Sequence, residues 1–169
     1  MMQTPTVRDQ QGFTLLEMMT VVMMVAVLAT IALPSYTEYA RKGAQAESQA
    51  LMLAISEDLG RYRGKNLTYR GYTFEDDLSA DNRVFYAPRG SSLTNHKYKI
   101  ELVDGVDRSV SLPNTTRGQQ WFMVATPNLS NNIVKTSHYL MLTSTGLRCK
   151  TRSALTINSV NCGADSENW

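Results

Sequence analysis

An apolar run near the N-terminus limits what this chain can fold into more than any other feature. Between Phe13 and Leu33 the only polar residues are Thr14, Glu17, Thr20 and Thr30. As an α-helix the run would measure roughly 31 Å, about the thickness of the hydrocarbon core of a bilayer. It therefore predicts a membrane-spanning helix at 13–35, and the remainder of the 169 residues is enough for one domain.

Two simpler roles for the run leave part of the sequence unexplained. A cleaved secretory signal would end in a small-residue cleavage site, but Ala32-Leu33-Pro34 follows the apolar core. A plain single-span anchor explains the length of the run but not Glu17, because a charge in hydrocarbon is costly and usually has a partner and a function. The flanking charges leave the orientation of the span open.

The residues at the start of the run resemble the processing motif of type IV prepilins. In the stretch Gly12-Phe13-Thr14-Leu15-Leu16-Glu17, the residues Gly12, Phe13 and Glu17 match that motif position by position. Gly12 is the last residue of a short polar leader, residues 1–12. The resemblance implies that a prepilin peptidase cuts after Gly12, on the cytoplasmic side, and that Phe13 becomes N-methylated. It also implies that Pro34 bends the helix, since the family places a proline and then an aromatic residue there.

The same resemblance gives Glu17 a partner. Cleavage would leave a cation at the amine of Phe13, one helical turn or roughly 6 Å from Glu17 along the axis. In type IV pilins the glutamate of one subunit neutralises the amine of another, whereas burying either charge alone costs several kcal/mol. The alternative is a local role at the helix start, worth less than about 1 kcal/mol. The neighbouring motif favours assembly.

Residues 36–169 are expected to form an α+β domain in the periplasm. An apolar stripe, Leu51, Ile55, Leu59 and Tyr62, predicts a helix over 36–62. Pro34 predicts a kink or break near Leu33, and Gly60 or Gly64 predicts the end of the helix. A polar connecting loop, 63–95, would lead to a sheet over 96–148. Alternation and turn signals predict about four antiparallel strands, at 97–103, 108–112, 119–127 and 138–145.

The only two cysteines, Cys149 and Cys162, lie near the C-terminus. With His96 and His138 they could in principle bind zinc, but the compact spacing of zinc sites is missing. A disulfide closing a loop over 149–162 is the favoured interpretation if the domain lies in an oxidising compartment, and this also places the domain outside the cytoplasm. Two unrelated buried thiols are the alternative. Type IV pilins commonly have a disulfide at this end.

Motifs of enzymes and cofactor sites are missing, so the sequence predicts neither catalysis nor a cofactor. The acidic residues at 75–77 and the pair Asp104 and Asp107 do not fit a calcium loop. Three basic residues surround Cys149, namely Arg148, Lys150 and Arg152; a solvated loop explains them more simply than DNA binding does. We expect Trp121 in the core and Trp169 exposed at the end of the chain.

The resemblance implies a structural subunit of a type IV pilus, and the C-terminal half is loosely similar to PilE-like minor pilins. Such a subunit would contact other pilins, major and minor, through its N-terminal helix. Its further partners would be the prepilin peptidase, which is also the N-methyltransferase, and the assembly platform of the inner membrane. It would begin in the bacterial inner membrane and end in the extracellular pilus. The alternatives are a DNA-binding competence pilin and a pseudopilin of type II secretion.

Overall fold

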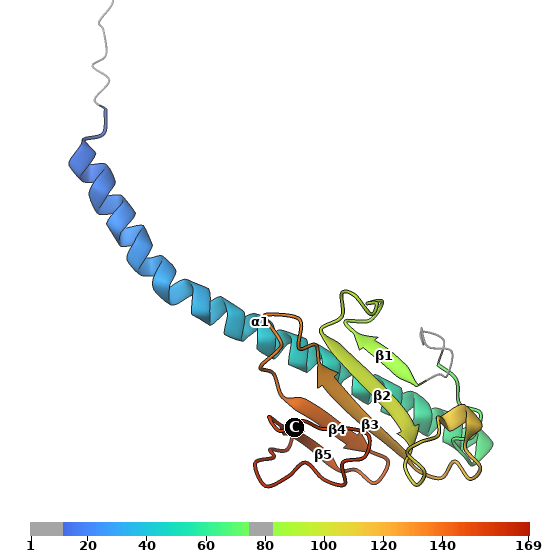
Figure 1. Ribbon diagram of the computed structural model, residues 1–169. Helices are drawn as coiled ribbons and strands as arrows, with labels where there is room; N and C mark the ends of the chain where they lie inside the picture. Colours follow the sequence, from blue (N-terminus) through green and yellow to red (C-terminus); the bar gives the residue numbers. More distant parts are fainter. Residues whose placement is uncertain (1–11, 75–82) are drawn as a thin grey trace, which may run out of the picture. The chain divides into compact units, whose positions relative to one another are not determined.

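The computed structural model describes residues 12–74 and 83–169, and inside the helix it leaves out the side chains of residues 33 and 34. One long helix and one sheet make up the molecule (Figure 1). The elements in chain order are α1 (Leu15–Asn66), β1 (Val84–Ala87), β2 (Tyr98–Asp104), the 3-10 helix η1 (Leu112–Asn114), β3 (Trp121–Pro127), β4 (Tyr139–Thr143) and β5 (Arg148–Thr151). The expected α+β class is confirmed. The chain divides into two compact units, Met1–Thr37 and Glu38–Trp169, which are described separately.

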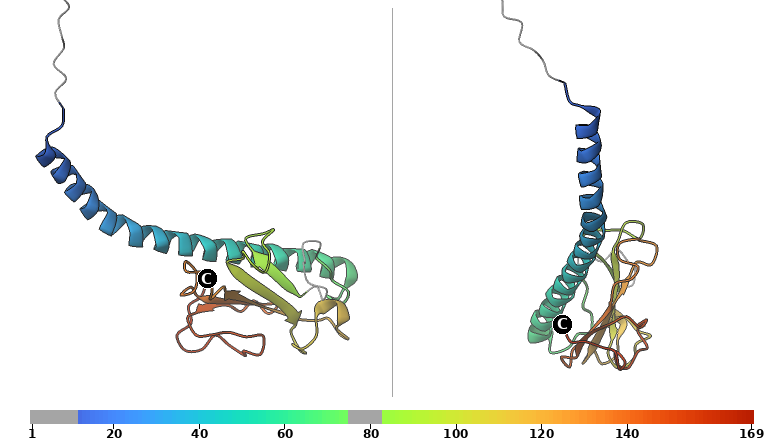
Figure 2. Two further views of the ribbon diagram at one scale, coloured as in Figure 1. Left: turned by 45° about the horizontal axis from the view of Figure 1, so that its top comes forward. Right: turned by 90° about the vertical axis from the view of Figure 1, so that its left-hand side faces the viewer.

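In the second unit the five strands form an antiparallel sheet in the order β1-β2-β3-β4-β5. The second half of α1 lies along one face of this sheet (Figure 2). Its buried residues recur three or four positions apart, which brings them onto one side of the helix: Ala44, Ser48, Met52, Ile55 and Leu59. This stripe packs on Ile100 and Leu102 of β2 and on Met123 of β3. Alternate residues of each strand point to opposite faces, so Ile100 and Leu102 of β2 face the helix while Val103 faces away from it.

The opposite face of the sheet has a smaller core of its own. Val103, Phe122, Val124 and Met141 point to this side, where the segment after β5 covers them with Leu155 and Cys162. Arg108 links this covering segment to the sheet. Its guanidinium donates to the carbonyl of Ile157, 3.1 Å away, and lies 3.9 Å from the ring centroid of Phe122. The sheet is therefore buried on both faces, by a helix on one and by irregular chain on the other.

Two expectations about the strands are wrong. Residues 108–112 form no strand, because Asp104 organises a turn there: its carboxylate accepts hydrogen bonds from the amides of Val106 and Asp107, at 2.7 and 2.8 Å. Pro113 then lies in η1, where no ladder donor is required. Conversely, β1 and β5 were not anticipated. Each has only four residues, and β1 lies inside the stretch expected to be a connecting loop.

The helix also ends later than expected. Gly60 and Gly64 lie inside α1, which continues to Asn66. Leu67 then adopts a left-handed conformation, with φ of 60°, while its amide still donates to the carbonyl of Arg63 at 2.7 Å. The Asn66 side chain donates to the carbonyl of Tyr62 at 3.0 Å and so satisfies a second free group at this end. At Pro34 the helix continues without a break; a kink there stays a prediction.

Candidate processing and assembly site

The expected cleavage site lies in extended chain just before α1. Gly12 and Phe13 are exposed, and 74% of the Phe13 surface is open to solvent. A Cβ atom added to Gly12 would meet nothing within 4 Å among the described residues. Packing against the described residues therefore gives no reason for a glycine at this position. A requirement imposed by another molecule, such as a peptidase that reads the junction, would give one.

Thr14 and Glu17 form the N-terminal cap of α1, a feature that the sequence reasoning missed. The hydroxyl oxygen of Thr14 accepts a hydrogen bond from the amide of Glu17 at 3.2 Å. The spacing Thr-x-x-Glu is that of a capping box, so a search for helix-start patterns would have found it. The cap explains how the backbone of Glu17 is held. Its carboxylate is exposed and has no hydrogen bond or ion pair with any residue in 12–74 or 83–169.

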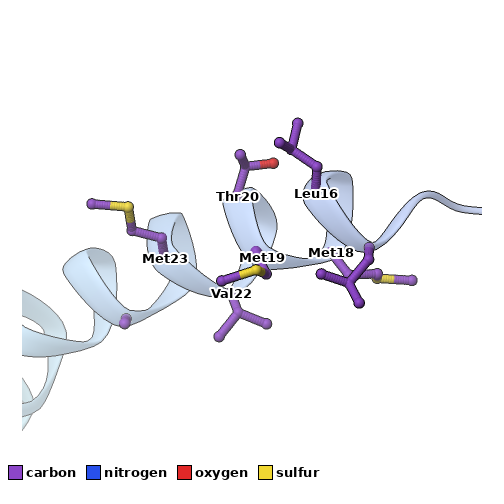
Figure 3. A pocket seen from close by; sticks show the side chains of 8 residues that line it. Leu16, Met18, Met19, Thr20, Val22 and Met23 are labelled. Atoms are coloured by element: carbon purple, nitrogen blue, oxygen red, sulfur yellow. The ribbon is translucent and has the colours of Figure 1, made fainter.

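The first turns of α1 expose apolar side chains in every direction. Leu16 and Thr20 project from one side of the helix and Met18 and Val22 from the opposite side (Figure 3). From residue 12 to residue 32 every side chain is exposed. The shallow hollows on this surface are lined only by neighbouring side chains of the same helix. They are therefore spaces between adjacent side chains and not a closed cavity. Such a surface requires an apolar environment, and residues 12–74 and 83–169 do not supply one.

The polar residues of this segment are compatible with that environment. The hydroxyl of Thr20 donates to the carbonyl of Glu17 at 2.8 Å, and that of Thr30 donates to the carbonyl of Val27 at 2.7 Å. Both donors are thus satisfied inside the helix, which hydrocarbon demands. Among the described residues, α1 is the one helix whose length and composition would let it cross a membrane. Glu17 is the only charged residue at positions 13–32, and its carboxylate has no partner among the described residues.

The disulfide at the other end of the domain is confirmed. Cys149 of β5 is bonded to Cys162, which lies 13 positions later in the sequence, and their Cα atoms are 6.3 Å apart. Both sulfurs belong to the second core, so the bond fixes the covering segment to the sheet. His96 and His138 face other partners: the Nδ1 of His96 lies 3.2 Å from the carbonyl of Ser92, and that of His138 lies 3.3 Å from Oε1 of Gln45.

The acidic residues do not gather into a metal site within the described ranges. Residues 75–77 lie outside these ranges. Asp104 is buried, and besides the two amides it accepts a hydrogen bond from the hydroxyl of Thr115 at 2.6 Å. Asp107 accepts from the amide and the hydroxyl of Ser109, which holds the pKa of its carboxyl below the ordinary value. Both residues therefore serve the turn after β2.

The basic residues around Cys149 differ in their surroundings. Lys150 forms an ion pair with Glu167 at 3.0 Å, and the two residues also exchange backbone hydrogen bonds, so the C-terminal segment pairs with β5. Arg148 and Arg152 are exposed. Trp169 was expected to be exposed, and this is wrong: its indole donates to the carbonyl of Cys149 at 2.9 Å and packs against the helix-side core. Trp121 is buried as expected.

Comparison with protein families agrees with the geometry of the N-terminus. Residues 7–33 match the family model of the prokaryotic N-terminal methylation motif. The match includes the glycine junction, the cap at Thr14 and the whole exposed apolar segment. The motif indicates a subunit like a type IV pilin or a pseudopilin. Comparisons of the whole chain with characterised proteins and with solved structures give no significant match.

Proposed function

We propose that this protein is a structural subunit of a type IV pilus, and more specifically a minor pilin of the PilE-like kind. The observation that carries the proposal is the methylation motif at the start of a helix whose apolar surface has no partner among the described residues. A prepilin peptidase would remove residues 1–12 and methylate Phe13. Residues 13–35 would first span the inner membrane, with residues 36–169 in the periplasm, and would later form the filament interior.

In the assembled filament, Glu17 would neutralise the Phe13 amine of a neighbouring subunit. Its carboxylate has no partner among the described residues, and leaving it unpaired in an apolar filament core would cost several kcal/mol. The capping bond does not compete with this role, because it uses the backbone amide of Glu17 and leaves the carboxylate oxygens free. Through assembly the subunit would contribute to twitching motility, adhesion or DNA uptake.

The disulfide supports a pilin over a pseudopilin of type II secretion. Pseudopilins often lack a C-terminal disulfide and often carry a calcium site instead. Here Cys149 and Cys162 are bonded, and the two described acids nearest to a calcium pattern, Asp104 and Asp107, are engaged in a turn. The two assemblies also differ in where the subunit is found, because a pilus projects from the cell.

The experiment that tests this function follows the chain from processing to filament. Intact mass of the protein from cells with an active prepilin peptidase should show loss of residues 1–12 and one methyl group on Phe13. Sheared and purified filaments should contain the protein at a small fraction of the major subunit. Full-length protein in such cells, or its absence from filaments that otherwise assemble normally without it, would contradict the proposal.

Gly12→Val sharpens the first step. Because nothing lies near a Cβ at this position, the substitution should leave the domain folded while it blocks cleavage. Gly64→Ala is the matched control, since it too adds a side chain to an unobstructed glycine but lies far from the junction. Normal cleavage of Gly12→Val would remove the peptidase as the reason for the glycine.

A further inference from the structure

Four basic or titratable side chains meet where the second unit begins. Arg41 of α1 donates to the hydroxyl of Thr136 at 2.8 Å, just before His138. The pairing of Tyr139 with Thr151, extended by one residue, places His138 opposite Arg152. Lys150 lies two residues before Arg152 and so points to the same face of the strand. We call Arg41, His138, Lys150 and Arg152, with the neighbouring Arg148, the basic face.

The positive charges of this face are only partly balanced. Glu38 pairs with Arg41 and Glu167 pairs with Lys150. Arg148 and Arg152 are exposed and have no ion pair with another described residue. The imbalance is visible at His138, whose pKa is lowered by partial burial and, next, by the charges of Arg152, Lys150 and Arg41, with Glu167 opposing them. An anion would therefore be attracted to this face.

The basic face is also close in sequence to the apolar segment. Arg41 lies eight residues after Leu33, so the chain between them spans at most about 29 Å. The polar headgroup region of a bilayer extends about 5–7 Å beyond the hydrocarbon, and charges act over a Debye length of about 8 Å at physiological salt. Once the apolar segment spans a membrane, this short stretch of chain keeps the second unit close to the membrane surface.

We propose that the basic face binds the phosphate headgroups of anionic phospholipids while the subunit waits in the membrane. The chemistry is that of guanidinium and ammonium groups contacting phosphate, which Arg148 and Arg152 are free to do. DNA offers the same phosphate chemistry, but the bilayer is tethered to this face by the chain itself, and so meets it at high effective concentration. The inference requires the membrane span but not the pilus role, so either can fail without the other.

The test uses the full-length chain in nanodiscs, with and without anionic lipid. Trp169 reports on the face, because its segment pairs with Lys150; Trp121→Phe removes the second tryptophan. Energy transfer from Trp169 to a dansyl-labelled phosphatidylethanolamine should be higher in discs of phosphatidylcholine with phosphatidylglycerol than in phosphatidylcholine alone. The increase should disappear at high salt, because screening weakens exposed charge interactions.

Two double variants distinguish an effect of the basic face from an effect of the chain's net charge. Arg148→Gln with Arg152→Gln should abolish the increase. Arg70→Gln with Arg117→Gln changes the net charge equally, but these exposed residues adjoin the far end of α1, about 37 Å along the helix from Arg41, and should preserve it. Equal transfer in both kinds of disc, or equal loss in both double variants, would overturn the proposal. A third outcome would also overturn it: a DNA duplex binds the wild-type chain in phosphatidylcholine discs, and Arg148→Gln with Arg152→Gln abolishes that binding. The basic face would then be a nucleic-acid site.

Discussion

The two halves of α1 are one continuous helix, yet they follow different rules. In the second half the buried residues recur every three or four positions, because a single partner, the sheet, lies on one side. In the first half, residues 15–32, the side chains are apolar on all sides and none is buried. A helical repeat of buried residues thus indicates a packing partner inside the chain. An apolar helix without such a repeat indicates surroundings that are apolar on every side.

The difference extends to the polar residues of each half. Ser48 in the buried stripe donates to the carbonyl of Ala44 at 2.9 Å, as Thr20 and Thr30 do to carbonyls in the first half, so neutral donors are satisfied locally in both. Several charged residues of the second half form ion pairs within that half: Arg41 pairs with Glu38, and Arg61 lies 3.5 Å from Glu57. Glu17 has none among the described residues. Substitutions in the two halves should therefore have separable effects.

The largest effect is expected from Glu17→Ala. The variant should insert, because loss of a carboxylate makes the span more apolar, and it should be cleaved, because the junction at Gly12 is intact. Incorporation into filaments should be lost, since the Phe13 amine of a neighbour would stay unpaired in an apolar core. The measurement is the amount of protein in membrane and sheared-filament fractions.

Glu17→Gln and Glu57→Ala complete this comparison. Glu17→Gln keeps the size but removes the charge, and should also be impaired if pairing matters. Glu57→Ala removes an exposed acid from the second half, where its ion pair with Arg61 is worth little, and should assemble normally. Normal amounts of both Glu17 variants in filaments would leave Glu17 only its part in the helix cap.

A pair of leucine substitutions compares the halves by stability. Leu59 is completely buried against the sheet, so Leu59→Ala should lower the free energy of unfolding of the domain by about 2–5 kcal/mol. Leu28 is 67% exposed, so Leu28→Ala should leave unfolding of the domain unchanged. Thermal unfolding of the detergent-solubilised chain, followed by near-UV circular dichroism, measures both. Similar losses in the two variants would mean that the halves do not differ as their burial indicates.

The disulfide provides a smaller and more local effect. Replacing Cys149 and Cys162 together by alanine should destabilise the domain by roughly 3 kcal/mol, the value of a loop of this length in the chain-entropy model. The loss should concentrate on the second core. Amide exchange should therefore accelerate in residues 152–163 and in β5, while the stripe of α1 keeps its protection. Uniform acceleration over both faces of the sheet would contradict this division of the domain.

The sequence predicted those parts of the fold that depend on periodicity. The stripe of Ile55 and Leu59 and the strands β2, β3 and β4 carry a repeat of side chains that matches their structure. The apolar segment has no such repeat and was recognised by its unbroken length. The segments at 84–87 and 148–151 were missed because four residues hold barely two alternations. β5 is a strand mainly because β4 pairs with it on one side and Glu167 pairs with it on the other. The sequence of β5 itself does not reveal these pairings.

Turn chemistry accounts for the remaining errors. The sequence of 108–112 alternates like a strand. However, the carboxylate of Asp104 binds the amides of Val106 and Asp107, and the carboxylate of Asp107 binds the amide of Ser109, so the chain turns here. Gly60 and Gly64 look like helix ends, yet Leu67 takes the left-handed position instead. At the candidate site, the junction and Glu17 could be predicted because they follow a linear motif. The basic face could not, because Arg41 and Arg152 come together only in the folded domain.

The smallest expected effect concerns His138, where the second half of α1 begins to contact the sheet. Its pKa is lowered by partial burial and by Arg152, Lys150 and Arg41, so the folded chain favours the neutral ring. As the pH falls below about 6.5, the unfolded chain binds the proton first, and the fold loses stability until the pH has passed the lowered pKa. The pKa of Glu167 is lowered chiefly by its hydrogen bond with Lys150, so titration of Glu167 affects stability only at more acidic pH.

The unfolding midpoint of the wild type should therefore drop more than that of His138→Gln between about pH 7.5 and pH 5.5. Parallel pH profiles for the two chains would show that the positive charges of Arg41, Lys150 and Arg152 are not felt at His138, and would weaken the case that they form one face.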